Sequence, residues 1–210
     1  TLIALAGGNI RYLLEIVDAA INIHFEEGYG KVGGRISIDP VAQTLAARAV
    51  GKRRLDQLEG LSERGVELKR LVLAIGKVFF ELARDPAGRA REQNSFGLSA
   101  PADDRAAAAA LLRDGVAHLA LLASPRTKQT SSPELRDEEY RLHPIFCPFF
   151  EYSHRRKRRI TIDAGSLLRL KTNPSQAIAE MLGHRQQMES TELPEQLAFF
   201  TDFFGTREAV

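Results

Sequence analysis

The chain turns and begins a helix within Gly7–Val17, which reads GGNIRYLLEIV. Two glycines followed by Asn9 favour a turn, and the apolar residues after them recur with helical periodicity. The pattern predicts an amphipathic helix over 9–26, with Arg11 in its first turn. Backbone N–H groups and the helix dipole favour anions at this end, and a guanidinium adds a bidentate contact to phosphate. The segment is therefore typical of a phosphate-sensing site.

The rest of the chain is predicted to be mainly helical. Helical spacing or capping residues indicate helices over 40–50, 55–61, 67–84, 103–114, 164–170 and 174–182, and a last one after Pro194. Short strands are expected at 96–98, 140–143 and 159–162, and residues 116–123 fit either a helix or a strand. The segment 51–54 is predicted to be a basic turn, 124–138 an exposed loop, and the run 145–152 an irregular stretch interrupted by Pro148.

Composition indicates a soluble globular protein of 210 residues, with 44% hydrophobic residues, 27% charged residues and a net charge of +2. A single cysteine and the lack of a long apolar stretch favour the cytoplasm. No phosphate-loop motif occurs, and the glycines at 28, 30 and 33 follow a helix instead of a strand. We therefore predict no catalytic and no metal-binding residue in this chain. Because it begins at Thr1, we expect it to be the carboxyl-terminal piece of a longer protein or a trimmed form.

The strongest local charge lies at 154–159, which reads HRRKRR. Consecutive cations repel one another and are typical of a surface that meets solvent or a polyanion. The pattern gives these candidates for contact with DNA phosphates: Arg155, Arg156, Lys157, Arg158 and Arg159. A weaker basic patch adds Lys52, Arg53 and Arg54. A solvated face or a protein contact remains an alternative for both patches.

These segments resemble parts of a known family. The stretch Gly7–Tyr12 with its helix resembles the start of the sensor-2 helix in the lid of AAA+ ATPases. The stretch 55–61 and the long helix after it resemble the entry into the winged helix of origin-recognition and replication-licensing ATPases. Residues 140–150 and the basic run are similar to bacterial ATPases of that clade. The resemblance covers most of residues 5–172.

The resemblance implies a mainly α fold, with a helical AAA+ lid remnant at 1–58 and a winged-helix domain with a short β-hairpin at 60–172. Residues 173–210 lie outside the resemblance, and their own pattern predicts a helical interaction tail with a phenylalanine-rich last helix that could bind a protein partner. Arg11, with Asn9 and Gly8, would contact ATP and its magnesium in the full-length protein, and Arg11 would be the sensor-2 arginine at the γ-phosphate. The wing at 124–138, which contains Lys128, would bind duplex DNA together with the basic run.

The resemblance also implies a preceding AAA+ core, since the Walker and arginine-finger elements are not in this sequence. The chain would act as the DNA-binding and nucleotide-sensing part of an ATPase only if such a core exists. Two alternatives stay open: a protein-interaction adaptor that does not bind DNA, and a free-standing DNA-binding regulator. No membrane partner is expected.

Overall fold

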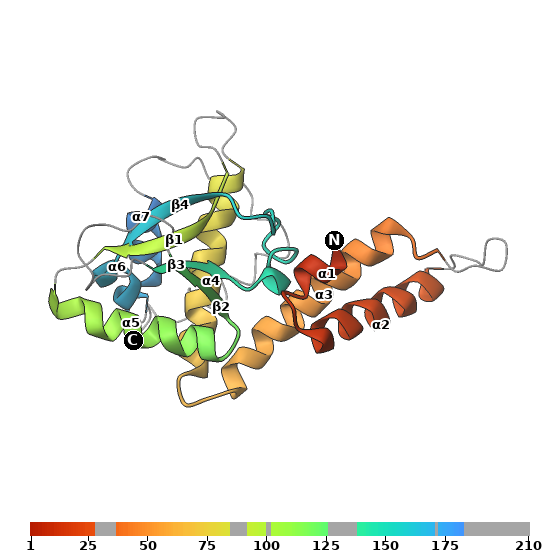
Figure 1. Ribbon diagram of the computed structural model, residues 1–210, viewed down its shortest axis with the longest axis horizontal. Helices are drawn as coiled ribbons and strands as arrows, with labels where there is room; N and C mark the ends of the chain where they lie inside the picture. The colour runs from red at the N-terminus through yellow and green to blue at the C-terminus, as the bar shows by residue number, and fades with distance from the viewer. Residues whose placement is uncertain (28–36, 85–91, 100–101, 126–137, 171, 183–210) are drawn as a thin grey trace.

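The computed structural model describes residues 1–27, 37–84, 92–99, 102–125, 138–170 and 172–182. Within these ranges the protein is mainly helical and has a small four-stranded sheet, which confirms the predicted fold class. Figure 1 shows a pair of long helices extending to one side and the sheet with its own helices on the other. This arrangement is consistent with a helical lid followed by a winged-helix-like region.

The extending part consists of α1 (Leu2–Leu5), α2 (Ile10–Glu26) and α3 (Pro40–Gln57). Helices α2 and α3 pack side by side and run in opposite directions (Figure 1). The prediction of a helix over 9–26 is confirmed. Asp39 caps α3, because its Oδ1 accepts a hydrogen bond from the backbone N–H of Val41 at 2.7 Å.

The predicted basic turn at 51–54 is wrong, because α3 continues through it to Gln57. Gly51 is a point of close packing and does not break the helix. A Cβ at Gly51 would stand 2.7 Å from the carbonyl oxygen of Ile145, so glycine lets α3 approach that backbone. The separate short helix predicted over 55–61 is replaced by the last turn of α3 and the 3-10 turn η1 (Leu58–Gly60).

Helix α4 (Gly65–Ala83) lies across one face of the sheet, and nearly all of its length is buried. Helix α5 (Ala102–Ala117) follows the first strand, while α6 (Ala164–Arg169) and α7 (Pro174–Leu182) follow the last one. These helices match the predicted ones within a few residues. Predicted helices after residue 182 lie outside the described residues. The boundaries at 58, 60 and 172 stay predictions, although α7, at the start of the predicted tail, packs on α4 and α6.

The sheet has the strand order β2-β3-β1-β4. Its strands are β1 (Gln93–Ser99), β2 (Leu121–Pro125), β3 (Glu138–Leu142) and β4 (Arg158–Asp163). Strands β2 and β3 pair as an antiparallel hairpin. Of the loop predicted at 124–138, residues 124, 125 and 138 belong to these strands, and residues 126–137 lie outside the described residues. Strand β1 pairs antiparallel with β3 and parallel with β4. The ambiguous stretch 116–123 contains both structures, since α5 ends at Ala117 and β2 starts at Leu121.

The run 145–152 joins the two parts of the molecule. The prediction from Pro148 that this run is not a regular helix is confirmed. It consists of a 3-10 turn, η2 (Pro144–Phe146), followed by further turns. Its aromatic side chains are buried, and the ring of Phe149 meets that of Phe150 edge-on at 4.9 Å. Helix α3 packs on η2, so the aromatic run connects the long helices to the core under the sheet.

Candidate functional site

The first turn of α2 presents Arg11 to solvent. Asn9 caps the helix, since its Oδ1 accepts a hydrogen bond from the backbone N–H of Arg11 at 3.0 Å. Gly7 and Gly8 precede it with φ of 57° and 86°, a left-handed turn that glycine adopts without strain. The Arg11 guanidinium is exposed and makes no ion pair with any residue in the described ranges. It is therefore available to an anion from outside this part of the chain.

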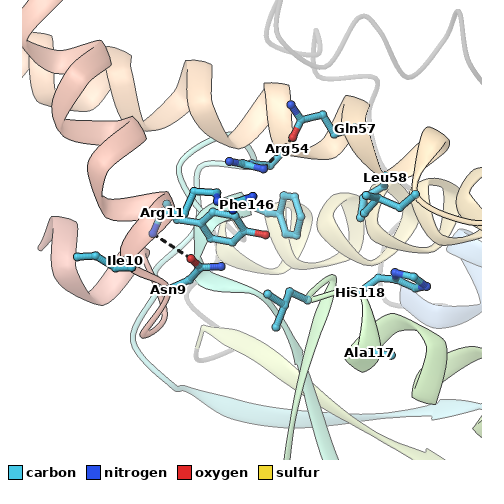
Figure 2. A pocket seen from close by; sticks show the side chains of 12 residues that line it. Asn9, Ile10, Arg11, Arg54, Gln57, Leu58, Ala117, His118 and Phe146 are labelled. Atoms are coloured by element: carbon cyan, nitrogen blue, oxygen red, sulfur yellow. Dashed lines mark hydrogen bonds between the residues drawn. The ribbon is translucent and has the colours of Figure 1, made fainter.

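Arg11 borders a pocket of about 500 Å³. The walls come from the start of α2, the end of α3 and the turn between α5 and β2, and η2 contributes Phe146 (Figure 2). Its lining includes the polar side chains of Asn9, Arg11, Arg54, Gln57 and His118 and the apolar side chains of Leu58, Leu61, Leu119 and Phe146. The pocket thus combines cationic and apolar groups at the junction of the two parts of the molecule.

Arg54, a predicted DNA contact, is engaged inside the protein. Its Nε donates to Glu15 Oε2 at 2.9 Å, and its Nη1 donates to Gln57 Oε1 at 2.9 Å. Its guanidinium also lies 4.6 Å from the ring centroid of Tyr12. Arg54 therefore ties α3 to α2 beside the pocket, and Arg11 is the pocket arginine whose charge is left exposed.

Leu119 lines this pocket and has a left-handed backbone with φ of 55°. Such a conformation is uncommon for leucine and costs about 1–3 kcal/mol. It ends α5, because the N–H of Ala120 reaches back to the carbonyl oxygen of Gly115 at 2.8 Å. Sequence reasoning missed Leu119, since no glycine or asparagine marks this turn.

The basic run leads from η2 and its turns into strand β4. Arg155, Arg156, Lys157 and Arg158 are exposed, and Arg159 is partly buried with its guanidinium against Gly97. Two of these cations have acidic partners. Arg156 pairs with Glu139 of β3, and Lys157 Nζ lies 2.9 Å from Glu92 Oε2. The charge of the run is thus partly neutralised by the protein.

The second basic patch lies near the carboxyl-terminal end of α3. Lys52 Nζ lies 3.6 Å from Asp56 Oδ2, and Arg53 is exposed. Lys128 lies outside the described residues. Lys52 and Arg53 thus lie on α3, whereas the run at 154–159 leads into β4.

Two buried histidines, His24 and His143, accept hydrogen bonds from the backbone. His24 Nδ1 accepts from the backbone N–H of Asp39 at 3.2 Å, and His143 Nδ1 accepts from that of Ile145 at 3.2 Å. Burial lowers the pKa of His143 to about 4, with a further contribution from Arg141.

In the described part of the chain, acidic, histidine and cysteine side chains form no group that could hold a metal ion. None of the helices in the described ranges could cross a bilayer, given their length and polarity.

The helical pair followed by a sheet-containing unit with a hairpin is consistent with a helical lid and a winged-helix-like region. A sequence model described as ORC-CDC6-like matches residues 1–162. The chain therefore belongs to the ORC-CDC6-like family and is related to the origin-recognition AAA+ ATPases. No curated protein and no solved structure matches it.

Proposed function

We propose that this chain is the carboxyl-terminal, nucleotide-sensing and DNA-binding part of an AAA+ ATPase. The observation that carries the proposal is the position of Arg11, capped by Asn9 in the first turn of α2, with its guanidinium exposed in a member of the ORC-CDC6-like family. ATP with magnesium, bound by a preceding core, would supply the hydrolysis chemistry.

The residues at the start of α2 fit a phosphate. Arg11 offers a planar guanidinium with several donors, and the helix amino terminus adds a favourable dipole. The Asn9 side chain is used by the helix cap, so its contribution is to orient Arg11. Nothing lies within 4 Å of the position that a Cβ on Gly8 would occupy, which leaves the backbone at Gly8 open to a bound group.

An apolar stripe on α2 supports docking of the ATPase core beside Arg11. Its members are Ile10, Leu14, Ile21 and Phe25, whose side chains are 67%, 61%, 37% and 47% exposed. They share one face of the helix, while Ile16, Ala20 and His24 on another face are buried. Exposed apolar residues in a row are typical of an interaction surface, and Ile10 and Leu14 lie next to Arg11 on α2.

The β2–β3 hairpin and the basic run support contact with duplex DNA. Strands β2 and β3 have the pairing that a wing requires, and the run adds exposed cations at strand β4. The ion pairs of Arg156 and Lys157 favour the alternative, an adaptor that binds protein instead of DNA, because they lower the charge available for phosphates.

ATP hydrolysis by the product of the complete open reading frame tests the nucleotide-sensing role. Arg11→Ala should reduce turnover about 10- to 100-fold, because a charge-assisted contact to phosphate contributes roughly 1.5–3 kcal/mol. Arg113→Ala, which removes an exposed arginine from α5, is the matched control and should hydrolyse ATP normally. Full turnover in the Arg11 variant would remove Arg11 from the nucleotide site.

Binding of the 210-residue chain to duplex DNA at about 50 mM salt tests the DNA-binding role, since phosphate contacts are weakly screened there. We expect weak binding with little sequence preference. Absence of binding under this condition would favour the adaptor.

A further inference from the structure

Asn94 holds the backbone of the basic run at three points. It lies in strand β1 and is only 4% exposed. Its Nδ2 donates to the carbonyl oxygens of Ser153 at 2.6 Å and Arg155 at 2.7 Å. Its Oδ1 accepts from the backbone N–H of Lys157 at 2.8 Å. One buried amide therefore fixes the path of the chain from residue 153 to residue 157.

Glu92 reinforces the same turn from its other side. One carboxylate oxygen accepts from the backbone N–H of Ser153 at 2.9 Å, and the other lies 2.9 Å from Lys157 Nζ. The backbone N–H of Arg158 donates to the carbonyl oxygen of Glu92 at 3.4 Å. The ammonium group of Lys157 is thus part of the structure that holds the turn.

Arg156 is engaged with strand β3. Its Nε donates to Glu139 Oε1 at 3.0 Å, and this contact holds the pKa of the Glu139 carboxyl below its usual value. The positive charge of Arg159 acts on Glu139 in the same direction. These two arginines therefore balance a carboxylate of the sheet.

Arg155 and Arg158 differ from their neighbours. Both are exposed, and neither side chain forms an ion pair with a residue in the described ranges. Arg155 lies in the turn that Asn94 holds, and Arg158 begins the edge strand β4. A fixed backbone lowers the ordering cost when such side chains bind a ligand.

We propose that Arg155 and Arg158 are the phosphate contacts of the basic run, that Arg156 and Lys157 hold the run to Glu139 and Glu92, and that Asn94 is a positioning residue. This inference rests on the proposed function, since it assumes that the chain binds duplex DNA. It assigns two phosphate contacts to a run of five cations.

The salt dependence of binding distinguishes two contacts from five. Each neutralised phosphate contributes about −0.9 to the slope of log affinity against log salt. Replacing Arg155 and Arg158 together with Gln should therefore make the slope shallower by about 1.8. The matched control is the pair deletion Arg156→Gln with Glu139→Gln, which removes one charge of each sign and should change the slope by less than about 0.3. A slope shallower by about 0.9 in the pair deletion would make Arg156 a phosphate contact and would overturn the assignment.

Asn94→Ala tests the positioning role. Affinity for duplex DNA should fall about two- to tenfold, because without the Asn94 amide the turn would become ordered only on binding. The salt slope should stay at the parent value. Titration at protein concentrations above Kd separates this effect from partial unfolding, which would lower the binding stoichiometry. If Asn94→Ala does not fold, Asn94→Ser serves in its place. Parent affinity in a folded Asn94 variant would overturn the positioning role.

The two levels of the proposal fail differently. If the parent chain does not bind duplex DNA at about 50 mM salt, the proposed DNA-binding function fails. If it binds with a salt slope that the Arg155 and Arg158 substitutions leave unchanged, DNA binding stands and the assignment of contacts fails.

Discussion

Gly7 lies directly against the imidazole of His143. A Cβ built on Gly7 would stand 2.5 Å from His143 Nε2, closer than two such atoms can approach. Tyr12 meets the same ring edge-on, with centroids 5.2 Å apart. The turn that leads to Arg11 therefore rests on a buried side chain at the end of strand β3. This contact links the turn to the part of the molecule that contains the sheet.

Gly7→Ala should lower the free energy of unfolding by about 2–4 kcal/mol. The alanine would bear a left-handed backbone and would overlap the imidazole of His143. Gly8→Ala is the matched control, because Gly8 is also left-handed but has nothing within 4 Å of its Cβ position. It should cost about 1–2 kcal/mol. Urea denaturation of both variants measures the difference, and equal losses would contradict the contact with His143.

His143 should make the fold sensitive to mild acid. Its pKa in the folded protein is about 4, below the ordinary value of 6.5, so the unfolded chain binds a proton first as pH falls. The contribution of His143 to stability should be constant well above pH 6.5 and should decrease between pH 6.5 and 4, by roughly 1.4 kcal/mol per pH unit at most. His143→Asn keeps an acceptor for the N–H of Ile145 and removes the titration. A parent and variant with the same pH dependence in this window would contradict the prediction.

The helices could be predicted from sequence because their signals are local. The period of apolar residues locates α2 within a few residues, and the caps Asp39 and Asp163 locate the starts of α3 and α6. The prediction of a basic turn at 51–54 was wrong because a glycine can either end a helix or allow close packing within it. Periodicity cannot distinguish a helix breaker from a glycine that admits the Ile145 carbonyl of a distant segment.

The sheet topology could not be predicted in the same way. The parallel pairing of β1 with β4 joins Phe96 to Ile160 across a long stretch of chain, and no local pattern encodes such a partner. For the candidate site, Arg11 and the basic run were evident from residue type and spacing. The roles of Asn94, Glu92 and Leu119 were not, since each depends on what tertiary packing places beside it.

Gly51→Ala should destabilise the protein by about 1–2 kcal/mol, although alanine normally favours a helix by about 1 kcal/mol over glycine. The new methyl group would stand 2.7 Å from the carbonyl oxygen of Ile145, and that backbone has little room to move. Gly60→Ala is the control, because nothing lies within 4 Å of its Cβ position. It should be neutral or slightly stabilising. Thermal denaturation compares the two, and a stabilised Gly51 variant would show that α3 does not pack closely on η2.

Arg54 should contribute to stability more than to DNA binding. Its side chain is 15% exposed and bonded to Glu15, so a double-mutant cycle of Arg54→Gln and Glu15→Gln should give a coupling energy of about 1–2 kcal/mol. The salt slope of DNA binding should be unchanged in Arg54→Gln. Arg53→Gln is the matched neighbour, since Arg53 is exposed on the same helix. A slope shallower by about 0.9 in Arg54→Gln would make Arg54 a phosphate contact. If the slope becomes shallower by about 0.9 only in Arg53→Gln, the DNA-contacting surface of α3 is the exposed one that carries Arg53.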